Sequence, residues 1–309
     1  MNTLADKIAA TRAECARELN RSPLAPLVEK LRAHRACETM LRSVLASSNR
    51  EQAVLALAAQ LGLVPGEEEQ GSRTFALPRA LLAAVALQNL DQVEGLPLET
   101  SVKAMIFDYC KFFVSPPPAQ VQLFDPSQHS FLALAKIASL ERFPAGQFDW
   151  EITGFPRSWL FKIPPTSLPK VAYFLVRHLH GFAPCIMPHI AYLRKSPLTE
   201  DCDKTWYSMA ISLERQPQIR GLVGFSWIFS PDTFKVSPYF LLLVKPMLES
   251  GGLVLTRGQV HDTDFMAGSE SRRKLYESGE FKPTMGVVLW SRDQMIQWAH
   301  SHPELCELE

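Results

Sequence analysis

Over residues 1 to about 142, apolar residues recur every three or four positions, a spacing typical of amphipathic helices. Leu4, Ile8, Cys15 and Leu19 show it in the first segment. The polar, acidic stretch 66–73 interrupts the pattern and predicts a solvated loop. The three prolines of 116–118 cannot continue a helix and predict a linker or stiff turn. We therefore expect a helical domain over residues 1–145.

Residue types at the ends of these apolar stretches predict where helices start. Ser22 followed by Pro23 fits an N-cap with proline at the first helical position. One apolar stripe then runs from Leu27 to Leu45, which favours a single second helix. Ser48 with Glu51 three positions later fits a capping box that opens a third helix.

Beyond about residue 145, aromatic and β-branched clusters are separated by prolines and glycines, which favours short strands. The predicted strands are Trp150–Ile152, Trp159–Ile163, Ile186–Leu193, Ile219–Phe229, Leu253–Thr256 and Thr284–Trp290. The predicted helices are Leu168–His180, Asp203–Arg215, Pro238–Ser250 and Ser269–Ser278. Strands that alternate with helices predict a mixed sheet covered by helices. The fold class is thus α+β, with a helical domain over 1–145 and a mixed α/β domain over 146–309.

Charge and hydropathy narrow the class of protein. The 309 residues contain 32 Lys and Arg and 32 Asp and Glu, so bulk electrostatics do not favour nucleic-acid binding. No apolar run reaches the roughly 18 residues that span a bilayer. Charged residues are interspersed from Met1 to Glu18, unlike the apolar core of a signal peptide. We expect a cytoplasmic protein without a membrane span.

Cysteines and histidines give no sign of a metal site. The six cysteines are scattered without a Cys-x-x-Cys pair, so we expect reduced, mostly buried thiols. His178, His180 and His189 lie near Cys185 in sequence, but their spacing matches no zinc motif. Motifs of serine hydrolases, P-loop NTPases and dinucleotide-binding enzymes are also missing.

One segment, Ile219 to Trp290, suggests a family. A strand is followed by a helix that ends at Gly251-Gly252, a second strand, and the phrase Leu275-Tyr276-Glu277-Ser278-Gly279-Glu280-Phe281 before a last strand. This order resembles the second half of the GNAT acyltransferase superfamily, whose phrase is one residue shorter between its glycine and phenylalanine. In place of that family's glycine-rich donor turn, residues 230–238 contain no glycine. Some GNAT-like enzymes without this turn take acyl groups from a carrier protein.

The resemblance implies transfer of an acyl group from a thioester donor, either coenzyme A or a carrier protein, to a small amine. The family's proton donor to the departing thiolate falls on Tyr276, whose phenol ordinarily has a pKa near 10. The general base would be His261, oriented by Asp262 or Asp264, or else an acidic residue. Backbone groups of the strand Gly221–Phe229 would align the acyl carbonyl. The acyl group would lie in an open V between two parallel strands.

The donor's anionic part needs positive charge and backbone N–H groups. Ser237 is expected to cap the helix that starts at Pro238, which leaves the amides of that helix start for an anion. Lys235, Arg272 and Arg273 supply positive charge nearby in sequence, for a phosphate or an acidic carrier protein. No metal and no cofactor besides the donor are expected.

Other interpretations remain open. Tyr276 can pack its ring against the sheet with its hydroxyl at the rim, and His261 can belong to an ordinary solvated loop. The chain would then be a non-catalytic binding or regulatory protein, with its helical half forming a groove or a homo-oligomer interface. An enzyme of another class on the same α/β half is a third hypothesis.

Overall fold

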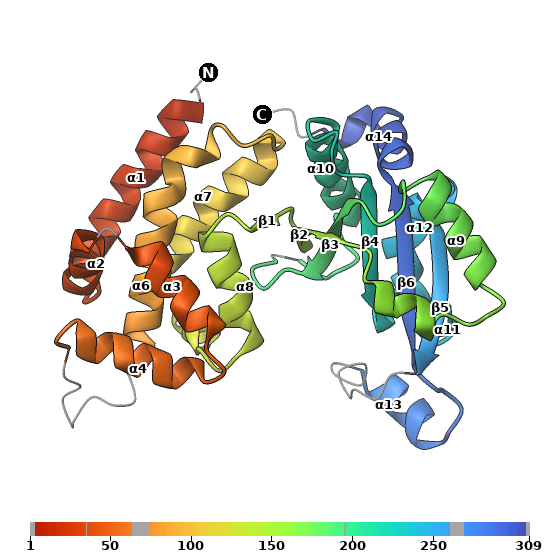
Figure 1. Ribbon diagram of the computed structural model, residues 1–309, viewed down its shortest axis with the longest axis horizontal. Helices are drawn as coiled ribbons and strands as arrows, with labels where there is room; N and C mark the ends of the chain where they lie inside the picture. The colour runs from red at the N-terminus through yellow and green to blue at the C-terminus, as the bar shows by residue number, and fades with distance from the viewer. Residues whose placement is uncertain (1–3, 35, 64–74, 195, 260–268, 307–309) are drawn as a thin grey trace. The chain divides into compact units, whose positions relative to one another are not determined.

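The computed structural model describes residues 4–34, 36–63, 75–194, 196–259 and 269–306. The chain divides into two compact units (Figure 1). One consists of Met1–Leu96 and Val102–Pro144, and the other of Pro97–Ser101 and Ala145–Glu309. A helical region followed by a mixed sheet with interleaved helices confirms the predicted α+β class.

The first unit is built around helix α6 (Ala76–Asn89). Residues 80–87 of α6 are all buried, as expected for a helix that is apolar on every side. It packs against its neighbours α2, α3, α4 and α8. The helices around it are α1 (Leu4–Arg21), α2 (Ala25–Ala33), α3 (Cys37–Ala46), α4 (Arg50–Gln60), α7 (Thr100–Val114) and α8 (His129–Ala138), with 3-10 helices η2 (Leu90–Val93) and η3 (Pro118–Phe124).

Two predicted helix starts are wrong by one or two residues. Helix α2 begins at Ala25, and the Ser22 hydroxyl accepts a hydrogen bond from the Leu24 N–H in the turn before it. Asn49 rather than Ser48 caps α4, with its Oδ1 3.1 Å from the Gln52 nitrogen. Asparagine and serine cap about equally well, so adjacent candidates cannot be separated by residue type. The predicted second helix is also two helices, α2 and α3.

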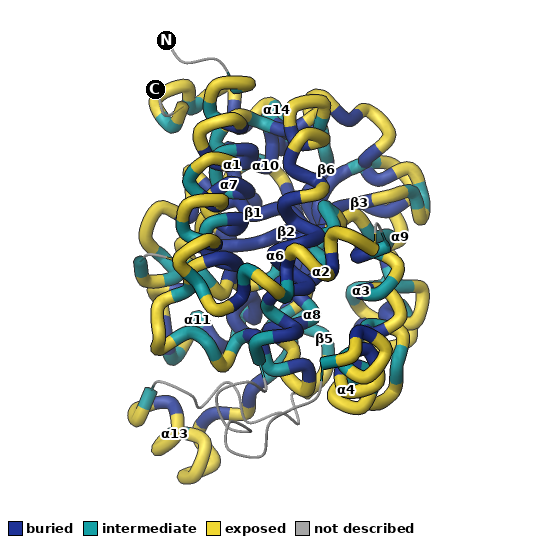
Figure 2. Tube along the Cα trace, turned by 90° about the vertical axis from the view of Figure 1, so that its left-hand side faces the viewer, coloured by how far each residue is buried: buried dark blue, intermediate teal, exposed yellow. Residues whose placement is uncertain are grey.

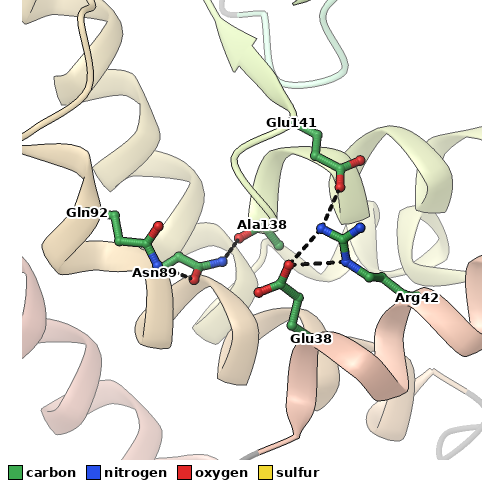
Figure 3. Close-up of polar contacts among 6 residues, drawn as sticks. All are labelled: Glu38, Arg42, Asn89, Gln92, Ala138 and Glu141. Atoms are coloured by element: carbon green, nitrogen blue, oxygen red, sulfur yellow. Dashed lines mark hydrogen bonds and ion pairs between the residues drawn. The ribbon is translucent and has the colours of Figure 1, made fainter.

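Polar contacts, one of them buried, fix the chain where α8 ends (Figure 3). Asn89 Nδ2 donates to the Ala138 carbonyl at 3.1 Å, and Gln92 Nε2 donates to Asn89 Oδ1 at 3.0 Å. Arg42 joins Glu38 of its own helix to Glu141, at 2.8 Å and 3.1 Å. These contacts hold the turn that leads from α8 to strand β1 (Arg142–Pro144).

The sheet has six strands in the order β1-β2-β3-β4-β6-β5. The remaining strands are β2 (Phe148–Gly154), β3 (Pro184–Ile190), β4 (Gly221–Ser226), β5 (Leu253–Gln259) and β6 (Thr284–Ser291). Strands β3 and β4 are parallel, whereas β2·β3, β4·β6 and β5·β6 are antiparallel. Figure 1 shows β4, β6 and β5 side by side in the second unit.

Helices cover both faces of this sheet. The helices are α9 (Leu168–Arg177), α10 (Cys202–Glu214), α11 (Pro231–Val236), α12 (Leu241–Glu249), α13 (Glu270–Glu277) and α14 (Arg292–His300), with 3-10 helices η4 (Arg157–Lys162), η5 (Trp227–Phe229), η6 (Pro238–Phe240) and η8 (Pro303–Leu305). On one face Trp206 of α10 stacks on Phe148 and meets Trp290 edge-on. On the other, Trp159 and Phe174 pack with Val223.

Some predicted elements differ from the structure. Residues 159–163 were predicted as a strand, but 157–162 form η4, with Trp159 buried and Phe161 exposed. The aromatic residues of this segment favour a strand. A 3-10 helix has three residues per turn, a period that differs from the strand's alternation. Helix α14 was not predicted, although Ser291 and Gln294 form a capping box at its start.

Two further findings concern the cysteines and the possibility of a membrane-spanning helix. Five of the six cysteines are buried thiols and Cys306 is an exposed one, as expected for free cysteines. Among the described helices, none combines the length and the apolar character needed to cross a membrane.

Candidate functional site

The parallel strands β3 and β4 pair at one position, Ile186 with Leu222. Beyond it β3 continues to Ile190 and β4 to Ser226, and no further position of the two strands is paired. The ladder therefore stops before either strand reaches its carboxyl end. In open sheets, ligands commonly bind at the carboxyl ends of neighbouring parallel strands.

Pro188 explains why the ladder stops. The Ala191 N–H donates to the Gln147 carbonyl at 3.0 Å, on the side of β3 that faces β2. Backbone groups alternate sides along a strand, so Pro188, three residues earlier, faces β4 as Ile186 does. Proline has no N–H, so it cannot form the next rung to β4. Gly224 lies opposite, where an added Cβ would be 3.2 Å from Pro188 Cγ.

A carboxylate–imidazole pair lies on one face of β2 and β3. Asp149 and Glu151 pair with His189 and Met187 across the two strands, so their side chains share that face. His189 Nε2 is 3.4 Å from Glu151 Oε1, with side chains 31% and 17% exposed. Asp149 is fully buried. The two groups lie at ion-pair distance, and the buried Nε2 of His189 has no hydrogen-bond partner among the described residues.

Arg257 of β5 brings a cation to the same face of the sheet. Its Cζ lies 5.3 Å from the Trp159 ring and 5.8 Å from the Phe225 ring, and these two rings meet edge-on. Burial lowers the pKa of Arg257 from its ordinary value. Within the described chain Arg257 forms no ion pair, and its buried Nε has no hydrogen-bond partner. A guanidinium held in this way can bind a carboxylate or phosphate.

Helix α13 is anchored near the carboxyl end of β4 by Arg272, which is 3% exposed. Its Nη1 donates to Ser237 Oγ at 3.2 Å and to Tyr239 Oη at 2.7 Å. Its Cζ lies 5.0 Å from the ring of Trp227, the residue that follows β4. The rest of α13 is largely exposed (Figure 2).

The structure brings together two of the predicted donor-binding residues, Ser237 and Arg272, but as partners of each other. Lys235 pairs with Asp232 at 2.7 Å and is 74% exposed. That bond to Lys235, and a second one to Thr284, hold the pKa of Asp232 below its ordinary value. Both Lys235 and Arg272 thus already have protein partners.

The remaining predicted residues are spread over α13 and the segment before it. Tyr276 lies one turn beyond Arg272 and is 44% exposed, so its phenol is not enclosed. Arg273 is exposed on the same helix. His261, Asp262 and Asp264 lie outside the described residues.

The predicted helix start at Ser237 needs correction. Ser237 does precede a helical turn with Pro238 in its first position, but that turn is the 3-10 helix η6. The Ser237 side chain makes no capping hydrogen bond and instead accepts from Arg272. The predicted helix Pro238–Ser250 corresponds to η6 and α12, and α12 connects β4 to β5. The helix that connects the parallel strands β3 and β4 is α10.

His178, another histidine near Cys185 in sequence, lies among aromatic side chains. The His178 ring packs against Phe174 at 4.8 Å and Tyr173 at 5.9 Å, at the end of α9. Burial raises the pKa of the nearby Cys185 thiol to about 12, which keeps it protonated. The described residues contain no cluster of three or more His, Cys, Asp and Glu side chains that could hold a metal ion.

Neither the Glu151–His189 pair nor Arg257 was singled out from the sequence. Asp149 and Glu151 alternate with Trp150 and Ile152, which is the pattern of a strand with one acidic face. That signal was readable, but the pairing with His189 depends on the register of β2 and β3.

Comparison of the chain with family models, with curated proteins and with solved structures gave no match.

Proposed function

We propose that the second unit is a GNAT-like acyltransferase, which moves an acyl group from a thioester donor to a small amine. The observation that carries the proposal is the parallel pair β3·β4, whose ladder stops at Pro188. An extended thioester arm laid beside β4 can use the strand's peptide groups as an added strand would. From β4 onward the chain forms a strand, a helix, a strand, a short helix and a strand, which is the order that the resemblance to GNAT acyltransferases requires.

Three side chains have roles in this reaction. The amine nitrogen attacks the thioester carbonyl carbon, and the C–S bond breaks. The amine proton passes to His189, whose Nε2 lies 3.4 Å from Glu151 Oε1. The thiolate sulfur takes the phenol proton of Tyr276, a residue that is 44% exposed. Solvent reprotonates the phenolate and deprotonates the imidazolium.

Arg257 suggests the kind of acceptor. It is on the same face of the sheet as His189 and has no ion-pair partner among the described residues. An amine that also carries a carboxylate would bind Arg257 through a charge-assisted hydrogen bond. Amino acids and their derivatives are therefore the acceptors to test first.

A carrier protein is the donor that the site favours over free coenzyme A. Residues 230–238 contain no glycine, and Asp232 keeps a negative charge there through its bond to Lys235. A pyrophosphate at this turn would meet that charge without a glycine cradle. A carrier protein presents its arm through surface contacts that do not need the turn.

The test is transfer from acyl-CoA and from acyl carrier protein to a panel of amino acids, followed by thiol release and product mass. We expect Tyr276→Phe and His189→Gln to lower kcat at least 100-fold. The matched control Tyr173→Phe changes an exposed tyrosine of α9 and should keep full activity. Folded protein that transfers no acyl group from any donor would refute the proposal.

A second function is favoured by one observation. Lys235 and Arg272 are held by Asp232, Ser237 and Tyr239, so the cations predicted for the donor are occupied. This arrangement suits a non-catalytic binding protein on the same scaffold. Equilibrium dialysis separates the two, since that protein would retain amino acids through Arg257 but bind no acyl thioester.

A further inference from the structure

The three most exposed large apolar side chains among the described residues lie close together in the sequence. Phe161 is 90% exposed, Val176 73% and Tyr173 64%. Single exposed apolar residues are common on protein surfaces and need no explanation. Three on consecutive elements, η4 and α9, indicate a surface that contacts something apolar.

Helix α9 explains why these side chains face outward. Val171, Phe174 and Leu175 are buried in the core against the sheet. At 100° per residue, Tyr173 and Val176 project from the opposite side of the helix. Lys170 and Arg177 are exposed beside them. Figure 1 shows α9 on the outer side of the α/β unit.

The charge around these residues has one sign. No Asp or Glu occurs from Ile152 to Thr199, whereas the same stretch contains six Lys and Arg. This excess is local, because the whole chain has 32 of each sign. Lys162, Lys170 and Arg177 form no ion pair with any described residue. Lysines elsewhere, such as Lys235 and Lys274, have carboxylate partners.

We propose that this surface, made of Phe161, Lys162, Lys170, Tyr173, Val176 and Arg177, binds the surface of an anionic phospholipid membrane. We call it the η4–α9 surface. Apolar side chains enter the boundary between headgroups and acyl chains, while the cations stay among lipid phosphates. The membrane attachment is peripheral and does not depend on acyl transfer.

A lipid surface fits better than an acidic protein. A protein partner would have to present a negative patch of matching shape, because charged protein interfaces pair a positive patch with a negative one. The η4–α9 surface has cations and no acidic residue within its stretch of chain. Phe161 is nearly fully exposed on a short turn, as expected of a side chain that inserts into a soft phase.

Sedimentation of the full chain with vesicles tests the proposal. We expect binding to vesicles of phosphatidylcholine with about one third phosphatidylserine, and about 100-fold weaker binding to phosphatidylcholine alone. Lys162→Gln, Lys170→Gln and Arg177→Gln together should weaken binding about 100-fold, since each charge contributes about fivefold. Phe161→Ser with Val176→Ser should weaken it at least tenfold.

Controls use exposed residues elsewhere. Leu55→Ser, at a side chain that is 60% exposed, and Lys245→Gln, also 60% exposed, should leave vesicle binding unchanged. Absence of binding to anionic vesicles by the folded protein would overturn the proposal. Binding that the η4–α9 variants do not change would also overturn it. Retention by an acidic protein without vesicle binding would assign the surface to a protein partner instead.

Discussion

Pro188 of β3 faces Gly224 of β4 so closely that a Cβ on the glycine would lie 3.2 Å from Pro188 Cγ and 3.0 Å from Val288 Cγ2. Both residues are buried at the level where the parallel ladder stops. The proline removes the backbone donor, and the glycine makes room for its ring. Together they set the spacing of the two strands at the candidate site.

Gly224→Ala should therefore destabilise the protein. The added methyl must displace two buried side chains, which costs about 1–2 kcal/mol in the free energy of unfolding. Urea denaturation measures this loss. Gly154→Ala is the matched control on β2, because its nearest non-neighbour atom would be 3.6 Å from the new Cβ. Equal losses in the two variants would mean that the Pro188–Gly224 contact is not tight.

Arg272→Lys should release α13 while keeping the charge. Lysine cannot stack on Trp227 or reproduce both hydrogen bonds to Ser237 and Tyr239. Hydrogen bonds to charged groups contribute about 1.5–3 kcal/mol each. Amide hydrogen exchange in α13 should accelerate strongly, with little change in β4 and β6. The adjacent Arg273→Lys affects an exposed residue and should leave exchange unaltered.

These contacts show where prediction from the sequence succeeded and where it could not. The strand 284–290 and the helix 203–215 were predicted to within one residue of β6 and α10, because hydrophobic period and length are local properties. The role of α10 as the connection between the parallel strands needs the strand order, which no local pattern contains.

The site depends even more on long-range contacts. Arg272 was predicted to supply positive charge for a phosphate or a carrier protein, but arginine is rarely buried, and the aromatic neighbours that surround Arg272 come from residues more than thirty positions away. Glu151 and His189 meet only through the register of β2 with β3. A register shift of one residue would place them on opposite faces.

Asp232→Asn should lower stability in a pH-dependent way. The Lys235 and Thr284 bonds depress the folded-state pKa of Asp232, so its contribution is fully present above the ordinary aspartate pKa of about 4. It is lost as the pH falls through the lower folded-state pKa. Because the side chain is 31% exposed, we expect a difference below about 1 kcal/mol at pH 7. Urea titrations at pH 7, 5 and 3 should show the difference shrinking only at the lowest pH.

Cys306 should react with thiol reagents much faster than the other five cysteines. Burial raises the pKa of Cys15 to about 11 and those of Cys110, Cys185 and Cys202 to about 12, and it also raises that of Cys37. Cys306 alone is exposed. Because the thiolate is the reactive form, a disulfide reagent at pH 8 should modify one thiol rapidly and the rest only on unfolding. Cys306→Ser should remove the rapid phase, and a surviving rapid phase would contradict the burial of the others.

His180→Gly should stabilise the end of α9. His180 has a φ of 55°, in the left-handed region that costs a residue with a side chain about 1–2 kcal/mol. Glycine removes that cost but gains freedom in the unfolded chain, which offsets about 0.5–1 kcal/mol. We expect a net gain of about 0.5 kcal/mol in the free energy of unfolding, measured in urea. His178→Gly provides the contrast: His178 has a φ of −110° and packs on Phe174, so glycine there should destabilise by about 1 kcal/mol. A loss at both positions would show that the left-handed residue carries no strain.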